Sequence, residues 1–132
     1  MKKNIVIDAG ALTLFFAGDL RVKEHFNEIE RGQADGHICS VNLAEFYYKT
    51  CEKLGKQTAD TWYHQSRTIL QVVETDETLT HSAGLEKCRQ ARRLSLADCH
   101  ALALTRRLKA LLITTDSELA KIKDIEAKYI EV

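Results

Sequence analysis

Four acidic side chains stand at positions where a folded chain could use them together. Asp8 ends a short apolar run, and Asp116 closes another. Glu45 and Asp98 each fall in the first turn of an expected helix. Carboxylate oxygens are hard donors that suit Mg²⁺ or Mn²⁺. Because such an ion can activate water and stabilise a phosphoryl oxygen, the pattern indicates hydrolysis of phosphodiester bonds.

Electrostatic magnitudes limit how these acids can be brought together. Two carboxylates about 5 Å apart repel by about 3 kcal/mol at an effective dielectric constant near 20. A helix N-terminus returns only about 0.3 to 1 kcal/mol per charge. Several such pairs would consume much of a domain stability of about 5 to 15 kcal/mol. A cluster of these acids therefore requires protonation or a divalent cation.

Each acid also has a purely structural interpretation. Asp8 and Asp116 could cap the helices that follow them, and Asp98 fits a capping box. Glu45 lies four residues before Lys49, the spacing of a helical ion pair. The sequence leaves both interpretations open at each position.

The elements that must position these acids alternate along the chain. Apolar runs predict strands at 4–8, 37–41, 71–74, 110–113 and 128–132. Helical periodicity and start signals predict helices at 9–16, 20–31, 42–53, 58–70, from 76 or 78 to about 92, from 95 to about 108, and at 117–121. This order predicts an α/β fold of three layers, α/β/α and Rossmann-like, around a parallel sheet. The acids are then expected near the carboxyl ends of the strands, where open α/β sheets bind ligands.

Composition is that of one ordinary globular domain. The chain has 132 residues, of which 45% are hydrophobic, and we expect a single domain over 1–132. Nineteen basic residues balance nineteen acidic ones, so any attraction for nucleic acid must be local. The four cysteines, at 39, 51, 88 and 99, form no CxxC pair and indicate a reduced, cytoplasmic protein. No apolar stretch approaches the length that spans a membrane.

Several common chemistries lack their motifs. The GxSxG, GxGxxG and Walker patterns are absent, which argues against the commonest hydrolase, dinucleotide and nucleotide sites. No two histidines lie within one helical turn, so no helical zinc motif exists.

Two groups of basic residues differ in their expected roles. Arg92 and Arg93 immediately precede a helix start at the proposed active edge, so they are candidates for phosphate contact. A solvated loop is the alternative interpretation for both. Arg106, Arg107 and Lys109 fall at a helix C-terminus, where they complement the helix dipole.

Four ordered motifs resemble one family. They are IVIDAG at 5–10, VNLAEF at 41–46, LSLADCHALAL at 94–104 and LLITTDSEL at 111–119. Along nearly its whole length the chain resembles the PIN-domain ribonucleases, and among them the short VapC-type toxins of toxin–antitoxin pairs. The resemblance implies a PIN-like sheet of five parallel strands and an endoribonuclease dependent on Mg²⁺ or Mn²⁺. It also implies an RNA substrate, a small antitoxin partner and a homodimer.

The resemblance and the charge argument together assign roles to the acids. Asp8, Asp98 and Asp116 would hold the cation. Glu45 would be a further ligand or the base that orients water. Arg92, Arg93 and Thr114 are the candidates for substrate contact.

One position departs from the family pattern. The family often has Ser or Thr two residues after the first Asp, where this chain has Gly10. Thr114 or Thr115 is a candidate to supply the missing hydroxyl. Two alternatives therefore remain: a PIN nuclease of RNA processing without an antitoxin, and a non-catalytic PIN-like module that binds RNA or protein.

Overall fold

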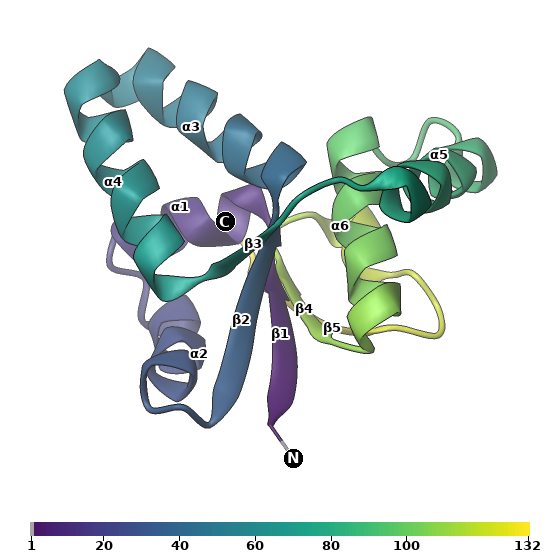
Figure 1. Ribbon diagram of the computed structural model, residues 1–132, viewed down its shortest axis with the longest axis horizontal. Coiled ribbons are helices and arrows are strands. Elements are labelled where there is room, and N and C mark those ends of the chain that lie inside the picture. Colours follow the sequence, from purple (N-terminus) through teal and green to yellow (C-terminus); the bar gives the residue numbers. More distant parts are fainter. Residues whose placement is uncertain (1) are drawn as a thin grey trace.

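Strands and helices alternate along the computed structural model, which describes residues 2–132 (Figure 1). The strands are β1 (Lys3–Ile7), β2 (Ala34–Cys39), β3 (Gln71–Val73), β4 (Leu111–Thr114) and β5 (Glu126–Tyr129). The helices are α1 (Ala9–Phe16), α2 (Leu20–Glu30), α3 (Ser40–Leu54), α4 (Lys56–Ile69), α5 (Glu77–Gln90), α6 (Leu96–Leu108) and α7 (Ser117–Ala120). The predicted order of elements is confirmed.

The strands form one sheet in the order β3-β2-β1-β4-β5, with every neighbouring pair parallel. The chain builds outward from β1 through β2 to β3 and then crosses to β4 on the other side of β1. The strand order therefore reverses between β1 and β4. In open α/β sheets this reversal leaves a crevice at the carboxyl ends of the two strands, where ligands bind.

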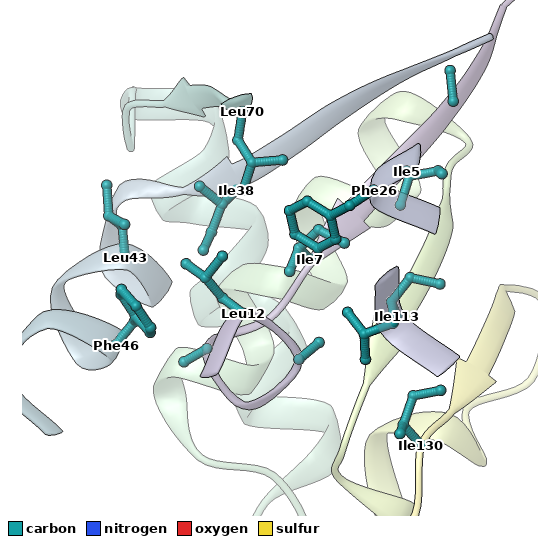
Figure 2. Packing of buried hydrophobic residues seen from close by; sticks show 14 residues of the cluster. Ile5, Ile7, Leu12, Phe26, Ile38, Leu43, Phe46, Leu70, Ile113 and Ile130 are labelled. Atoms are coloured by element: carbon teal, nitrogen blue, oxygen red, sulfur yellow. The ribbon is translucent and has the colours of Figure 1, made fainter. Parts of the chain in front are cut away.

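Alternating strand residues build two cores, one on each face of the sheet. Ile5 and Ile7 of β1 belong to the core that α1, α2 and α3 cover, whereas Val6 belongs to the core beneath α5 and α6. Figure 1 shows α1 to α4 on one side of the sheet and α5 with α6 on the other. Figure 2 shows the first core, in which Leu12 of α1 lies among sheet residues. The predicted three-layer α/β/α fold is thus confirmed.

Helix α6 is the most deeply embedded of the elements that carry an acid. Every residue from 99 to 105 is buried, and a capping box fixes its first turn. The helix ends at Lys109, which adopts the left-handed conformation of a C-cap (φ 50°). An acid on the first turn of this helix is therefore held on a rigid support.

Two strands differ from their predicted ranges by more than one residue. Strand β2 begins at Ala34 rather than at 37, because Gly36 continues the strand instead of breaking it. A Cβ there would overlap the side chains of Ile29 and Leu70, so glycine lets them pack against the backbone. The last strand is Glu126–Tyr129 rather than 128–132, because residues 125 and 127 pack on the second core.

Within residues 2–132, no helix is both long enough and apolar enough to cross a membrane.

Candidate active site

The four predicted acids, Asp8, Glu45, Asp98 and Asp116, line one cavity at the carboxyl edge of the sheet. The cavity has a volume of about 330 Å³. We call it the acid cavity; its other lining residues are Ala9, Gly10, Thr13, Lys49, Ser95 and Thr115. The acids come from the ends of β1 and β4 and from the helices α3 and α6, so residues remote in sequence meet here.

Asp8 is the most buried of these acids, with 5% of its surface exposed. One carboxylate oxygen accepts from the backbone N–H of Ala11 at 2.8 Å, which caps α1. The other accepts from the Thr114 hydroxyl at 2.5 Å. Burial raises the pKa of Asp8 to about 6, against the lowering effect of these hydrogen bonds, and the Asp98 charge adds to the rise.

Thr114 links the acids of the two central strands. Its hydroxyl donates to Asp8 and accepts from the backbone N–H of Asp116 at 3.0 Å. The side chain is fully buried. The expected contact of Thr114 with substrate therefore does not fit this geometry, and the hydroxyl instead positions two of the acids.

Asp98 and Asp116 are held by the starts of their own helices. The Asp98 carboxylate accepts from the backbone N–H of Ser95 at 3.2 Å, while the Ser95 hydroxyl accepts from the Asp98 N–H at 3.1 Å. The Asp116 carboxylate accepts from the Leu119 N–H at 2.9 Å and caps α7. Burial raises the pKa of Asp98, and the charges of Asp116 and Glu45 raise it further, although the Ser95 contact opposes this.

Capping a helix and lining the acid cavity are compatible roles for these acids. The caps predicted at Asp8, Asp98 and Asp116 all form, and the same carboxylates still line one cavity. Capping leaves each carboxylate with accepting capacity, because an ionised carboxylate has about four lone-pair sites. A helix start therefore fixes each acid without consuming it.

Glu45 is paired with a lysine inside the acid cavity. Helix α3 begins at Ser40, two residues before the predicted start, so Glu45 lies in the second turn rather than the first. Its carboxylate accepts from Lys49 Nζ at 2.9 Å, the predicted helical ion pair. This contact raises the pKa of Lys49, and the Asp98 charge raises it too. Lys49 was not among the predicted site residues, although its spacing of four from Glu45 predicts the shared helix face.

The donors in the acid cavity have the chemistry of a magnesium or manganese site. All four are hard oxygen ligands, and all four line the same cavity. Within residues 2–132, however, no three histidine, cysteine or acidic side chains are arranged closely enough to hold a metal ion as they lie. Each carboxylate instead turns to a local partner, as mutual repulsion between like charges favours.

Asn42 joins two of the helices that carry acids. It is buried, and its Nδ2 donates to the backbone carbonyl of Ala97 at 3.0 Å. The first turn of α3 is thereby tied to the first turn of α6, which sets Glu45 relative to Asp98. The local sequence pattern predicts Asn42 only as a helix start, since it indicates no partner 55 residues away.

Gly10 packs directly against the Thr115 side chain in the wall of the acid cavity. A Cβ at position 10 would overlap the Thr115 hydroxyl oxygen. The Thr115 hydroxyl therefore fills the volume that a side chain at position 10 would take. Glycine in a helix is about 0.5 to 1 kcal/mol less favourable than alanine, so this close approach gives a physical reason for its presence in α1.

The remaining predicted residues lie outside the acid cavity. Arg92 and Arg93 are exposed in the connection between α5 and α6 and do not line it, so their contact with phosphate stays a prediction. The structural role expected for Arg106 and Arg107 is confirmed: the first pairs with Glu86 at 3.1 Å and the second with Asp76 at 2.8 Å.

Comparison with known proteins identifies the family. The sequence model of the PIN domain matches residues 5–125, so the chain belongs to the PIN domain family. No curated protein matches it in sequence.

Solved structures share its fold over nearly its full length. The VapBC2 complex of Rickettsia felis, bound to a promoter DNA fragment, contains a chain that matches with a TM-score of 0.74 at 14% identity, covering 97% of this chain and 99% of that one. The DNA-bound VapBC of Salmonella typhimurium gives 0.74 at 19% identity, with 98% of each chain covered. VapC20 of Mycobacterium tuberculosis, described as a toxin that cleaves the sarcin-ricin loop, gives 0.73 at 18%, covering 97% and 98%. At these identities the similarity establishes the fold.

The fit between Gly10 and Thr115 predicts a rescue experiment. Gly10→Ser should lower the free energy of unfolding by about 1 to 3 kcal/mol, because the new Cβ overlaps the Thr115 hydroxyl. Thr115→Ala removes that oxygen, so the double variant should recover most of the loss. Urea denaturation of the two single variants and the double variant measures the coupling. Additive effects would contradict the proposed overlap.

The raised pKa of Asp8 predicts a pH dependence of stability in metal-free protein. The folded state holds the Asp8 proton more tightly than the unfolded state, whose pKa is near 3.8. The stabilisation of the folded state by protonated Asp8 is therefore fully present below about pH 4 and is lost as the pH rises through about 6. Asp8→Asn removes the titration, so its stability relative to the parent should increase between these pH values. Urea denaturation in chelator measures this difference, and a constant difference would contradict the raised pKa.

Proposed function

We propose that this protein is an endoribonuclease that depends on Mg²⁺ or Mn²⁺ and acts as the toxin of a toxin–antitoxin pair. The observation that carries the proposal is the meeting of four carboxylates in one cavity on a PIN fold, where the strand order reverses. Their donor chemistry suits a hard divalent cation. A phosphodiester bond is the substrate that such a site is best equipped to hydrolyse.

Asp8, Asp98 and Asp116 would hold the cation, with Glu45 as a further ligand or as the group that orients water. The ion, when bound, would supply positive charge that activates water and stabilises a phosphoryl oxygen. In the second role Glu45 would accept a proton from the attacking water; its present partner, Lys49, also lines the acid cavity and is half exposed. Thr114 would keep the Asp8 carboxylate directed into the cavity by its hydrogen bond.

The toxin role has support of its own, in addition to the observations that support the nuclease. Structures of similar fold are the toxin–antitoxin complexes VapBC of two bacteria and the toxin VapC20. We therefore expect a small antitoxin protein to bind this chain, and a homodimer as the family resemblance implies. A neighbouring reading frame for a small DNA-binding protein would favour the toxin over an RNA-processing nuclease. The cytoplasmic location stays a prediction.

The nuclease proposal predicts the loss of cleavage on removal of one acid. Asp98→Asn should reduce metal-dependent cleavage of single-stranded RNA by about a hundredfold or more, because the amide cannot carry the negative charge that holds the ion. Asp19→Asn is the matched control: Asp19 also caps a helix but lies outside the acid cavity. Cleavage by Asp98→Asn at the parental rate would end the proposal, and circular dichroism checks that both variants fold.

The metal proposal predicts stabilisation by the ion itself. Mn²⁺ at about 100 times its dissociation constant should stabilise the folded protein by about 2.7 kcal/mol. For a domain of this size we expect the melting temperature to rise by several degrees relative to protein in chelator. Asp98→Asn should show a smaller rise, and Asp19→Asn the full one. A melting temperature that does not respond to Mn²⁺ at any concentration would contradict the metal site.

A further inference from the structure

A second cavity, of about 330 Å³, opens beside the acid cavity. Its apolar part is made by Leu14 of α1, Leu54 of α3, Trp62 of α4 and Val132, and Lys53 borders it. We call this cavity the apolar groove. In Figure 1, α3 and α4 form a V-shaped hairpin on one side of the sheet, and α1 is seen between its two arms.

The apolar groove is continuous with the acid cavity. Gly10, Thr13, Lys49 and Thr115 line both. A chain held across the acid cavity would therefore enter the groove without a break. The close approach of Gly10 to Thr115 forms part of this shared wall, because no side chain projects from position 10.

Trp62 presents an aromatic surface that is fixed in place. Its ring stacks on Phe16, with centroids 4.9 Å apart and planes 10° from parallel. The indole is only partly buried and lines the groove. Bases of single-stranded nucleic acid stack on such aromatic side chains with little regard to sequence.

Lys53 gives the groove a local positive charge, beside a second lysine that is already paired. Lys49 and Lys53 lie one turn apart on α3, and both are exposed. Within residues 2–132, Lys49 pairs with Glu45, whereas Lys53 makes no ion pair. Since the acidic and basic residues of the whole chain balance, attraction for a polyanion must come from such a local group.

We propose that the apolar groove binds the nucleotide next to the scissile phosphate of a single-stranded RNA. Its base lies against Trp62, and its phosphate contacts Lys53. This inference rests on the proposed function for the position of the scissile phosphate. The charge of Lys53 favours RNA over an apolar peptide that has no acidic side chain, because such a peptide would leave Lys53 without a partner.

Trp62 is the only tryptophan in the sequence, so its fluorescence reports directly on the groove. The probe is a seven-nucleotide 2′-O-methyl oligoadenylate, which is titrated into full-length protein in chelator so that no cleavage occurs. A matched abasic oligonucleotide has the same phosphates without bases. We expect the oligoadenylate to quench Trp62 and the abasic strand to bind at least about fivefold more weakly without quenching.

Two charge-matched variants test the lysine. Lys53→Gln should raise the dissociation constant of the oligoadenylate about fivefold at low salt and reduce the salt slope by about 0.7, as expected for one lost phosphate contact. Lys23→Gln is the control: Lys23 is an exposed lysine on α2 that lines neither cavity. Its binding should match the parent.

Two outcomes would overturn the inference. One is RNA binding by fluorescence anisotropy that leaves Trp62 emission unchanged, which would make a protein segment the better candidate occupant. The other is equal binding by the Lys53 and Lys23 variants. Failure of the nuclease is separable, because these titrations need no metal: quenching without Mn²⁺-dependent cleavage would retain the groove and reject the proposed function.

Discussion

Repulsion between carboxylates at one end of the sheet is the constraint on which the rest of this structure depends. Asp8, Asp98 and Asp116 are held near one another by backbone and hydroxyl donors. Each donor contributes little alone, since a helix start stabilises a charge by about 0.3 to 1 kcal/mol. Burial is the largest cause of the raised pKa of Asp8 and of Asp98, and the charges of neighbouring carboxylates raise both further. The cation that we propose for this site would offset that repulsion.

The fold holds the acids on rigid supports, so their mutual repulsion does not separate them. Strands β1 and β4 are neighbours at the point where strand order reverses, and the Asp8 backbone N–H donates to the Ile113 carbonyl at 3.2 Å across them. Helix α6 is buried along most of its length, and Asn42 ties it to α3. The acids cannot move apart without disturbing the packing of both cores.

Local structural roles and chemical roles coincide at this site. The caps of α1 and α7 and the capping box of α6 use the same carboxylates that line the acid cavity. A positively charged side chain also lines the cavity, because Lys49 pairs there with Glu45. Beyond it, the apolar groove extends the same surface over α3 and α4, which gives the site a second region of different chemistry.

The sequence by itself determined the order of the elements, the parallel sheet and the four acids, because hydrophobic periodicity and helix-start chemistry are encoded locally. It also predicted the ion pair of Glu45 with Lys49 from helical spacing. It did not determine that Thr114 bridges Asp8 and Asp116, that Asn42 reaches Ala97, or that Thr115 fills the space above Gly10. Those contacts join segments that only the folded sheet brings together. Tertiary structure decided them because a side chain's partner depends on strand order and helix packing, which local sequence patterns do not specify.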